Sequence, residues 1–117
     1  MICLKKDAEN LVISQHTIIA RSFIDRAFGL IIRNFGENLD GMVFENCNLI
    51  HSFLMRYKFD LVFIEQSGEV VKCYENACPN KIFSGGSRKK LIAIELPCGT
   101  ICKFNIKNGD FLTLKNR

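Results

Sequence analysis

The chain has 117 residues and a mass of 13.4 kDa, a length that corresponds to one domain. Hydrophobic residues make up 48% of it and charged residues 24%, which excludes intrinsic disorder, collagen and a coiled coil. The net charge is +4 without a dense basic stripe, so we expect no nucleic-acid partner. A chain of this size buries roughly two-thirds of its unfolded surface, and residues 1–117 are predicted to fold as a single domain without a metal or disulfide.

The N-terminal segment carries no targeting signal of the secretory type. Residues 1–7 lack an apolar h-region, and no apolar run of 18 residues occurs further along the chain. We therefore expect a cytoplasmic protein that does not bind a membrane and keeps its six cysteines as thiols.

The first predicted elements are a strand and a short helix. Leu11 to Ala20 is rich in β-branched residues and alternates in part, which indicates a strand. Ser22 is a candidate N-cap for a helix whose apolar stripe consists of Phe23, Ala27, Leu30 and Ile31. Arg26 and Arg33 are seven residues apart, so they lie on one side of that helix.

Shorter strands follow through the rest of the chain. They are predicted at 42–45, 49–55, 60–65, 69–74, 91–96 and 111–114. One helix and about seven strands predict an α+β domain. Its sheet is expected to be antiparallel-rich and strongly curved or barrel-like, with the one short helix near the N-terminus.

The segments 49–55 and 60–65 are expected to form a hairpin around residues 56–59. This register pairs His51 with Ile64 and Met55 with Asp60, so one apolar face also carries a histidine and an aspartate. The two lie about 13 Å apart at ~3.4 Å per residue, which is too far for a shared hydrogen bond. We therefore predict no catalytic residue, and a binding groove edged by Arg26, Arg33, His51, Met55 and Asp60.

Alternatives remain open for three polar side chains of the predicted sheet. For His51 there are three alternatives: an imidazole of the core or groove edge that hydrogen-bonds the backbone, a residue that contacts a ligand, or a catalytic group. Asp60 accepts from the turn backbone or pairs with Arg26 or Arg33. Glu95 is out of phase with its apolar neighbours and is either solvent-facing or salt-bridged.

The segment from Glu75 to Lys90 is predicted to be irregular. A loop of about 16 residues is uncommon in a compact domain, and it is either a plain surface loop or a lid over a site. Its Arg88-Lys89-Lys90 cluster is expected to be solvated, and its glycines give only a weak indication of a phosphate site because no strand-to-helix turn contains them.

The cysteine spacing does not indicate a metal centre. Cys73 and Cys78 are separated by four residues and Cys98 and Cys102 by three, whereas zinc knuckles favour a separation of two. We expect small buried thiols, no metal and no cofactor. The standard hydrolase, P-loop and dinucleotide motifs are also absent from the sequence.

A set of linked motifs resembles a known family. They are Arg26 to Arg33, Gly41 to Phe44, His51 to Met55, Asp60 to Ile64, Ile94 to Gly99 and Asn108 to Asp110. Their order and spacing resemble the domain of unknown function 192 family (uncharacterised protein family 0127) of bacteria and archaea, over about residues 20–114. This chain differs at Leu54, where many members have the Trp of a Phe-Trp-Met motif, at Ile31, where they have Met, and at Cys98, where a small Ala is common.

The resemblance implies a compact domain with a barrel-like antiparallel sheet beside a short helix, and no settled activity. Members occur as cytoplasmic and as exported proteins, and some are thought to lie near secretion or pilus genes. Our leading hypothesis is a non-catalytic ligand-binding or accessory protein, because polar groups recur on an apolar face without a complete catalytic set, and the resemblance suggests a link to secretion or pilus systems. The alternatives are a small hydrolase that uses His51 or Asp60 as general base, and a protein-interaction module that uses a sheet edge or residues 75–90. The ligand, the partner and the oligomeric state are left open.

Overall fold

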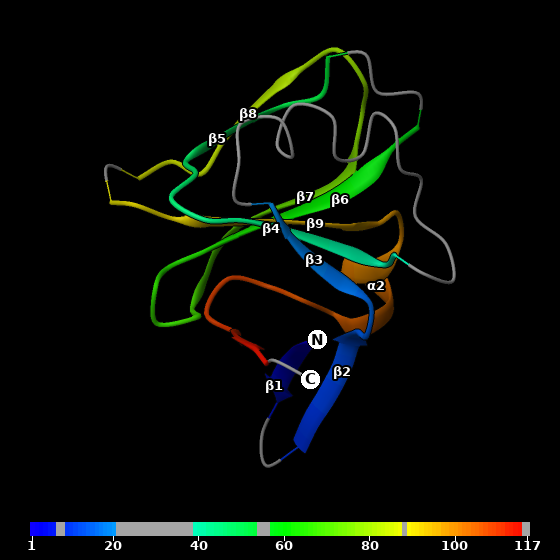
Figure 1. Cartoon of the computed structure of the whole chain (residues 1–117), viewed down its shortest axis with the longest axis vertical. Coiled ribbons are helices and arrows are strands. Elements are labelled where there is room, and N and C mark those ends of the chain that lie inside the picture. The colour runs from blue at the N-terminus through cyan, green and yellow to red at the C-terminus, as the bar shows by residue number, and fades with distance from the viewer. Residues whose placement is uncertain (7–8, 21–38, 54–56, 88, 116–117) are drawn as a thin grey trace.

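The structure is a computed structural model that describes residues 1–6, 9–20, 39–53, 57–87 and 89–115. Within these residues it contains three separate β-sheets and one short helix. Figure 1 shows the largest sheet across the middle, a two-stranded ribbon on one side of it and a three-stranded sheet with the helix on the other.

The three-stranded sheet joins the two ends of the chain. Its order is β10-β1-β2, with β1 at Ile2–Lys6, β2 at Glu9–Ser14 and β10 at Phe111–Leu114. All pairs are antiparallel, and Leu4 lies opposite both Leu112 and Leu11. The ammonium group of Met1 donates to the carbonyl of Lys115 at 3.0 Å, so the first residue lies beside the end of the described chain.

The central sheet has five strands in the order β3-β4-β9-β6-β7. The strands are β3 Thr17–Ala20, β4 Gly41–Phe44, β6 Phe59–Ile64, β7 Val70–Ala77 and β9 Ile92–Pro97. Only β3 and β4 run parallel, and the other neighbours are antiparallel. Strand β6 is buried along its whole length because it lies between β7 and β9 and both of its faces are covered.

Two hydrophobic clusters cover the two faces of the central sheet. One contains the side chains of Phe59, Leu61 and Phe63 together with Ile50 and Phe83 of the ribbon. The other contains the alternate side chains of the same strands and the inner face of the three-stranded sheet, including Val62, Ile64, Ile94, Ile2, Leu4 and Leu112. The alternation along β6 therefore supplies apolar side chains to both clusters.

The ribbon pairs two strands of three residues, β5 at Leu49–His51 and β8 at Ile82–Ser84. In both strands only the middle residue is buried. The Phe83 ring packs edge-on against Tyr74 at 5.1 Å and Phe59 at 6.3 Å between centroids, which holds the ribbon on the sheet.

The helix of the described chain, α2 at Thr100–Phe104, lies near the C-terminal end. The one short helix predicted near the N-terminus, at about 22–33, lies outside the described residues. Helix α2 is not predicted, because five residues are too few for a helical period to be recognised in the sequence. No helix among the described residues has the length and apolar character needed to cross a membrane.

The described residues are mostly β-strand with one short helix, and of the two expected forms of the sheet, strongly curved or barrel-like, the barrel-like one is wrong, because the sheets of these residues are not closed into a barrel. The predicted first strand, 11–20, is also divided into β2 and β3, which belong to different sheets. Asp40 fixes the break: its carboxylate accepts hydrogen bonds from the Ser14 hydroxyl at 2.7 Å and from the backbone N–H groups of Gln15 and His16. Burial alone would raise the pKa of Asp40, but these hydrogen bonds and the charge of His16 lower it overall.

The predicted hairpin between 49–55 and 60–65 is wrong as well. Strand β5 pairs with β8, with His51 opposite Ile82, while β6 pairs with β7 and β9. Part of the segment 75–90 is therefore strand, and its role as a lid stays a prediction. Gly85 in this segment packs against the core, because a Cβ atom there would overlap Leu91 and lie 3.0 Å from the Phe63 ring.

Candidate functional site

Two of the five predicted groove residues lie within the described chain, and the structure places them in different layers. Asp60 is on β6 of the central sheet and His51 is on β5 of the ribbon. Arg26, Arg33 and Met55 lie outside the described residues. The binding role predicted for these side chains stays a prediction.

The Asp60 carboxylate is a buried structural group. It has no exposed surface, and it accepts backbone hydrogen bonds from Asn76 at 3.0 Å, Gly99 at 3.1 Å and Ile101 at 2.8 Å. These donors come from the end of β7 and from the start of α2, so one side chain joins three elements. The expectation that Asp60 accepts from backbone has the right chemistry, but the donors come from distant elements and not from the adjacent turn.

His51 lies on the outward face of the ribbon. Leu49 and Ile82 flank it there and are 57% and 59% exposed, and Phe53, 45% exposed, stacks on the imidazole with 5.1 Å between ring centroids. We call these four side chains, Leu49, His51, Phe53 and Ile82, the ribbon patch. Large apolar side chains clustered on one exposed face are typical of an interaction surface.

Two polar side chains, the buried Ser52 and the half-buried Asn48, give the ribbon a fixed shape. The Ser52 hydroxyl donates to the carbonyl of Cys78 at 2.7 Å and accepts from the N–H of Lys81 at 2.9 Å, which shapes the turn before β8. The Asn48 amide donates to the carbonyls of Ser87 and Lys89 and accepts from the N–H of Leu91 at 2.8 Å. The ribbon patch is thus displayed by a supported element.

Glu95 lies on β9 in the middle of the central sheet, opposite Met42 and Leu61. The side chain is 5% exposed, so the solvent-facing alternative is wrong. Burial raises the pKa of this carboxyl to about 8, which keeps it protonated at neutral pH. Glu95 also affects Tyr57. Burial, followed by the charge of Glu95, raises the pKa of the Tyr57 phenol to about 12.

The six cysteines are free thiols in different settings. Cys3 and Cys47 are buried as expected, whereas Cys98 and Cys102 are exposed, so the expectation of buried thiols is wrong for that pair. Burial, with the nearby carboxylates of Asp110, Glu75 and Asp60, raises the pKa of the Cys73 thiol to about 11, which makes it a poor nucleophile at neutral pH. Among the described residues, no three His, Cys, Asp or Glu side chains are grouped to hold a metal ion.

Two surface hollows lie on the side of the central sheet opposite the ribbon. One, of about 450 Å³, is formed between the β2–β3 turn and the start of α2, and its lining includes Asp40 and Lys103. The other, of about 740 Å³, is formed by β1, β10 and the turn at 107–110. Neither hollow can be recognised from the sequence, because their walls come from segments far apart in the chain.

Of the ribbon patch, only His51 is predicted from the sequence as a site residue. Ile82 belongs to a segment predicted as loop, and Leu49 belongs to a predicted strand whose exposed face could not be known before its partner. The hypothesis of a protein-interaction module is the one that points toward this patch, because it names residues 75–90, which include Ile82.

Comparison with solved structures shows that this fold is shared. A protein of unknown function from Novosphingobium aromaticivorans DSM 12444 superposes with a TM-score of 0.79 at 20% identity, over 97% of this chain and 83% of that one. A putative transcription regulator from Sinorhizobium meliloti 1021 superposes with a TM-score of 0.74 at 21% identity, over 96% and 90% of the two chains. At these identities the likeness shows the fold alone.

No curated protein matches the sequence. The model of the DUF192 family, described as uncharacterized ACR, matches residues 4–114. This match covers nearly the whole length, and it includes residues 4–6 of β1 and all of β2, which lie outside the region of resemblance indicated by the motifs. The chain therefore belongs to the DUF192 family.

Proposed function

We propose that the protein is a non-catalytic accessory domain that binds a partner protein through the ribbon patch. The observation that supports this proposal is the clustering of Leu49, Phe53 and Ile82, each at least 45% exposed, around one stacked imidazole. Exposed aromatic and aliphatic side chains of this kind form the centres of protein interfaces.

The charge of the surroundings supports a partner with carboxylates beside an apolar segment. Residues 47–53 and 78–87, which form the ribbon and its turns, include Lys81 as their charged side chain and contain no Asp or Glu. Lys81 is exposed at the turn next to Ile82. An apolar segment flanked by carboxylates complements such a surface, and charge complementarity favours its approach over that of a basic segment.

The hydrolase alternative receives less support from the geometry. A general base must reach a substrate proton within about 3 Å, directly or through one water. Asp60 has no exposed surface and uses both carboxylate oxygens to accept backbone hydrogen bonds. His51 is exposed, and its closest described ring neighbour is the apolar Phe53.

A peptide display experiment tests the proposal. Random seven-residue segments flanked on both sides by Glu, Gln or Lys are selected on the purified protein. Apolar segments should be enriched most strongly when Glu flanks them, less strongly with Gln and least with Lys. The enriched peptides should lose about tenfold in affinity, about 1.4 kcal/mol, with Leu49→Ser or Ile82→Ser.

Two further variants control the result. Val12 is 41% exposed on the three-stranded sheet, so Val12→Ser removes a comparable apolar side chain elsewhere and should leave the affinity unchanged. Lys81→Glu should reverse the preference for acidic flanks. Failure to enrich any peptide, or equal losses from Val12→Ser and Ile82→Ser, would contradict the proposed function.

A further inference from the structure

The larger surface hollow lies far from the ribbon patch, at the sheet that joins the ends of the chain. Its volume is about 740 Å³, which falls in the range of small-molecule sites. The lining consists of Lys5, Lys6, Ser67, Lys107, Gly109, Asp110, Phe111, Leu112 and Thr113. We call this hollow the lysine pocket.

One wall of the lysine pocket is held firmly in place. The Asp110 carboxylate accepts from the backbone N–H of Lys107 at 3.0 Å and binds the Lys6 ammonium at 3.1 Å. The backbone N–H of Gly109 donates to the carbonyl of Val70 at 2.9 Å, and the N–H of Val70 donates to the carbonyl of Asp110 at 2.8 Å. The turn at 107–110 is therefore anchored to β7, and a ligand would not have to order it.

The lining carries an excess of positive charge. Three lysines against one aspartate give a net charge of +2. Lys6 is engaged by Asp110 and by the carbonyl of Asn105 at 2.7 Å, whereas Lys5 and Lys107 are exposed and form no ion pair with another residue of the described chain. Two ammonium groups are thus available to an anion.

The lysine pocket also offers an aromatic surface. Phe111 is 42% exposed and lies directly opposite Lys5 in the pairing of β1 with β10. Its ring can cover one face of a flat heterocycle, and the hydroxyl groups of Ser67 and Thr113 can hydrogen-bond the polar atoms between ring and anion. A basic group next to a ring and hydroxyls matches the chemistry of a phosphorylated nucleoside.

We propose that the lysine pocket binds a free nucleoside phosphate, with Lys5 and Lys107 on the phosphate and Phe111 against the base. This site is independent of the partner surface on the ribbon, which lies on the other side of the central sheet. Figure 1 shows β1 and β10 below that sheet and β5 and β8 above it.

Titration of the purified protein with adenosine monophosphate, followed by amide NMR, tests the proposal. We expect saturable shifts confined to residues 5–6, 67 and 107–113, and at least tenfold weaker binding of adenosine or inorganic phosphate alone. Lys5→Ala combined with Lys107→Ala should weaken the nucleotide at least tenfold, and Phe111→Ser should remove its advantage over phosphate.

Lys58→Ala is the matched control, because Lys58 is an exposed lysine that does not line the pocket. It should leave the affinity unchanged, and circular dichroism should show all variants folded. Three results would overturn the proposal. They are no saturable binding of the nucleotide, equal binding of inorganic phosphate, and tighter binding of a short oligonucleotide than of the free nucleotide.

Discussion

Asp60 shows how a single polar residue can be identified from sequence while its role is decided by the fold. An aspartate among apolar strand residues must have partners when buried, and this much follows from composition alone. Its donors, however, are backbone N–H groups of Asn76, Gly99 and Ile101, which lie 16, 39 and 41 positions away. No local pattern specifies such contacts, because they depend on how β6, β7 and α2 meet.

Asp60→Asn tests this structural role. The amide keeps the size of the side chain but replaces one acceptor oxygen by a donor, which faces backbone N–H groups that also donate. Hydrogen bonds to a charged group contribute about 1.5–3 kcal/mol, so we expect a loss of about 2–4 kcal/mol in the free energy of unfolding. Urea denaturation measures it, and Glu75→Gln, at an exposed acid, should change stability by less than about 0.5 kcal/mol. A fully stable Asp60→Asn would contradict the structural role.

The raised pKa of Glu95 predicts that the free energy of unfolding depends on pH. Its pKa in the folded protein is about 8, against an ordinary value of 4.5, so the folded state binds more protons than the unfolded state between these values. Stability contributed by this group is therefore full below about pH 4.5 and is lost as pH rises toward 8, with a slope of at most about 1.4 kcal/mol per pH unit. Glu95→Gln should abolish that slope in denaturation curves measured from pH 5 to 9, and an unchanged slope would show that another group causes it.

At the scale of elements, most strands can be predicted from local sequence, whereas the pairing of strands cannot. The predicted segments at 42–45, 60–65, 69–74, 91–96 and 111–114 correspond to β4, β6, β7, β9 and β10. Their apolar runs and the Gly68 and Gly109 turns, both with positive φ, are local signals. The pairing of β5 with β8 is not local, and three-residue strands carry too little alternation to indicate it.

The same distinction explains the candidate sites. His51 stands out in the sequence because of its chemistry, but its neighbour Ile82 on the ribbon is 31 positions away and joins it only through the β5–β8 pairing. Lys5 and Phe111 in the lysine pocket are separated by most of the chain and meet because the first and last strands pair. Sites assembled across sheets become visible only once the topology is known.

Ser52 supports the ribbon, and Ser52→Ala tests whether the ribbon patch depends on that support. The hydroxyl is fully buried, and its loss leaves the carbonyl of Cys78 and the N–H of Lys81 without this partner. We expect a loss of about 1–3 kcal/mol and faster amide exchange in β5 and β8 than in β6. Ser67→Ala is the control, because the exposed Ser67 hydroxyl accepts one long bond of 3.4 Å. Equal exchange rates in both variants would show that the ribbon does not need Ser52.

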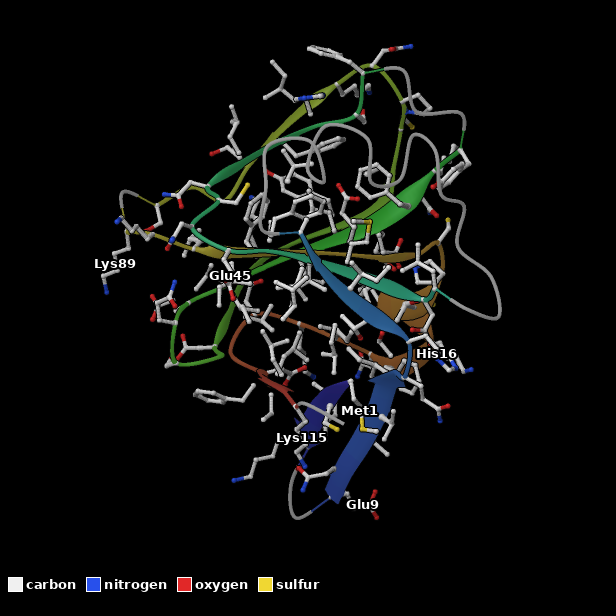
Figure 2. The ribbon with its side chains drawn as sticks, in the orientation of Figure 1. Met1, Glu9, His16, Glu45, Lys89 and Lys115 are labelled. Atoms are coloured by element: carbon white, nitrogen blue, oxygen red, sulfur yellow. The ribbon has the colours of Figure 1, made fainter. Side chains whose placement is uncertain are left out.

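At the scale of the whole molecule, the two hydrophobic clusters share the strands of the central sheet. Leu61 belongs to the cluster under the ribbon and Leu4 to the cluster over the three-stranded sheet, while β6 supplies side chains to both. Figure 2 shows side chains filling the space on both sides of the sheet. Loss of either cluster would expose one face of the same strands, so the layers cannot unfold one at a time without a large cost.

This arrangement predicts a single cooperative unfolding transition. Tyr57 and Tyr74 pack against the cluster under the ribbon, so tyrosine fluorescence reports that side, while far-ultraviolet circular dichroism reports all three sheets. The two signals should follow one urea curve. Leu4→Ala should shift both curves together by about 2–5 kcal/mol, although Leu4 lies on the far side of the sheet from the two tyrosines. A variant in which circular dichroism changes before fluorescence would show that the three-stranded sheet, with its lysine pocket, unfolds as a separate unit.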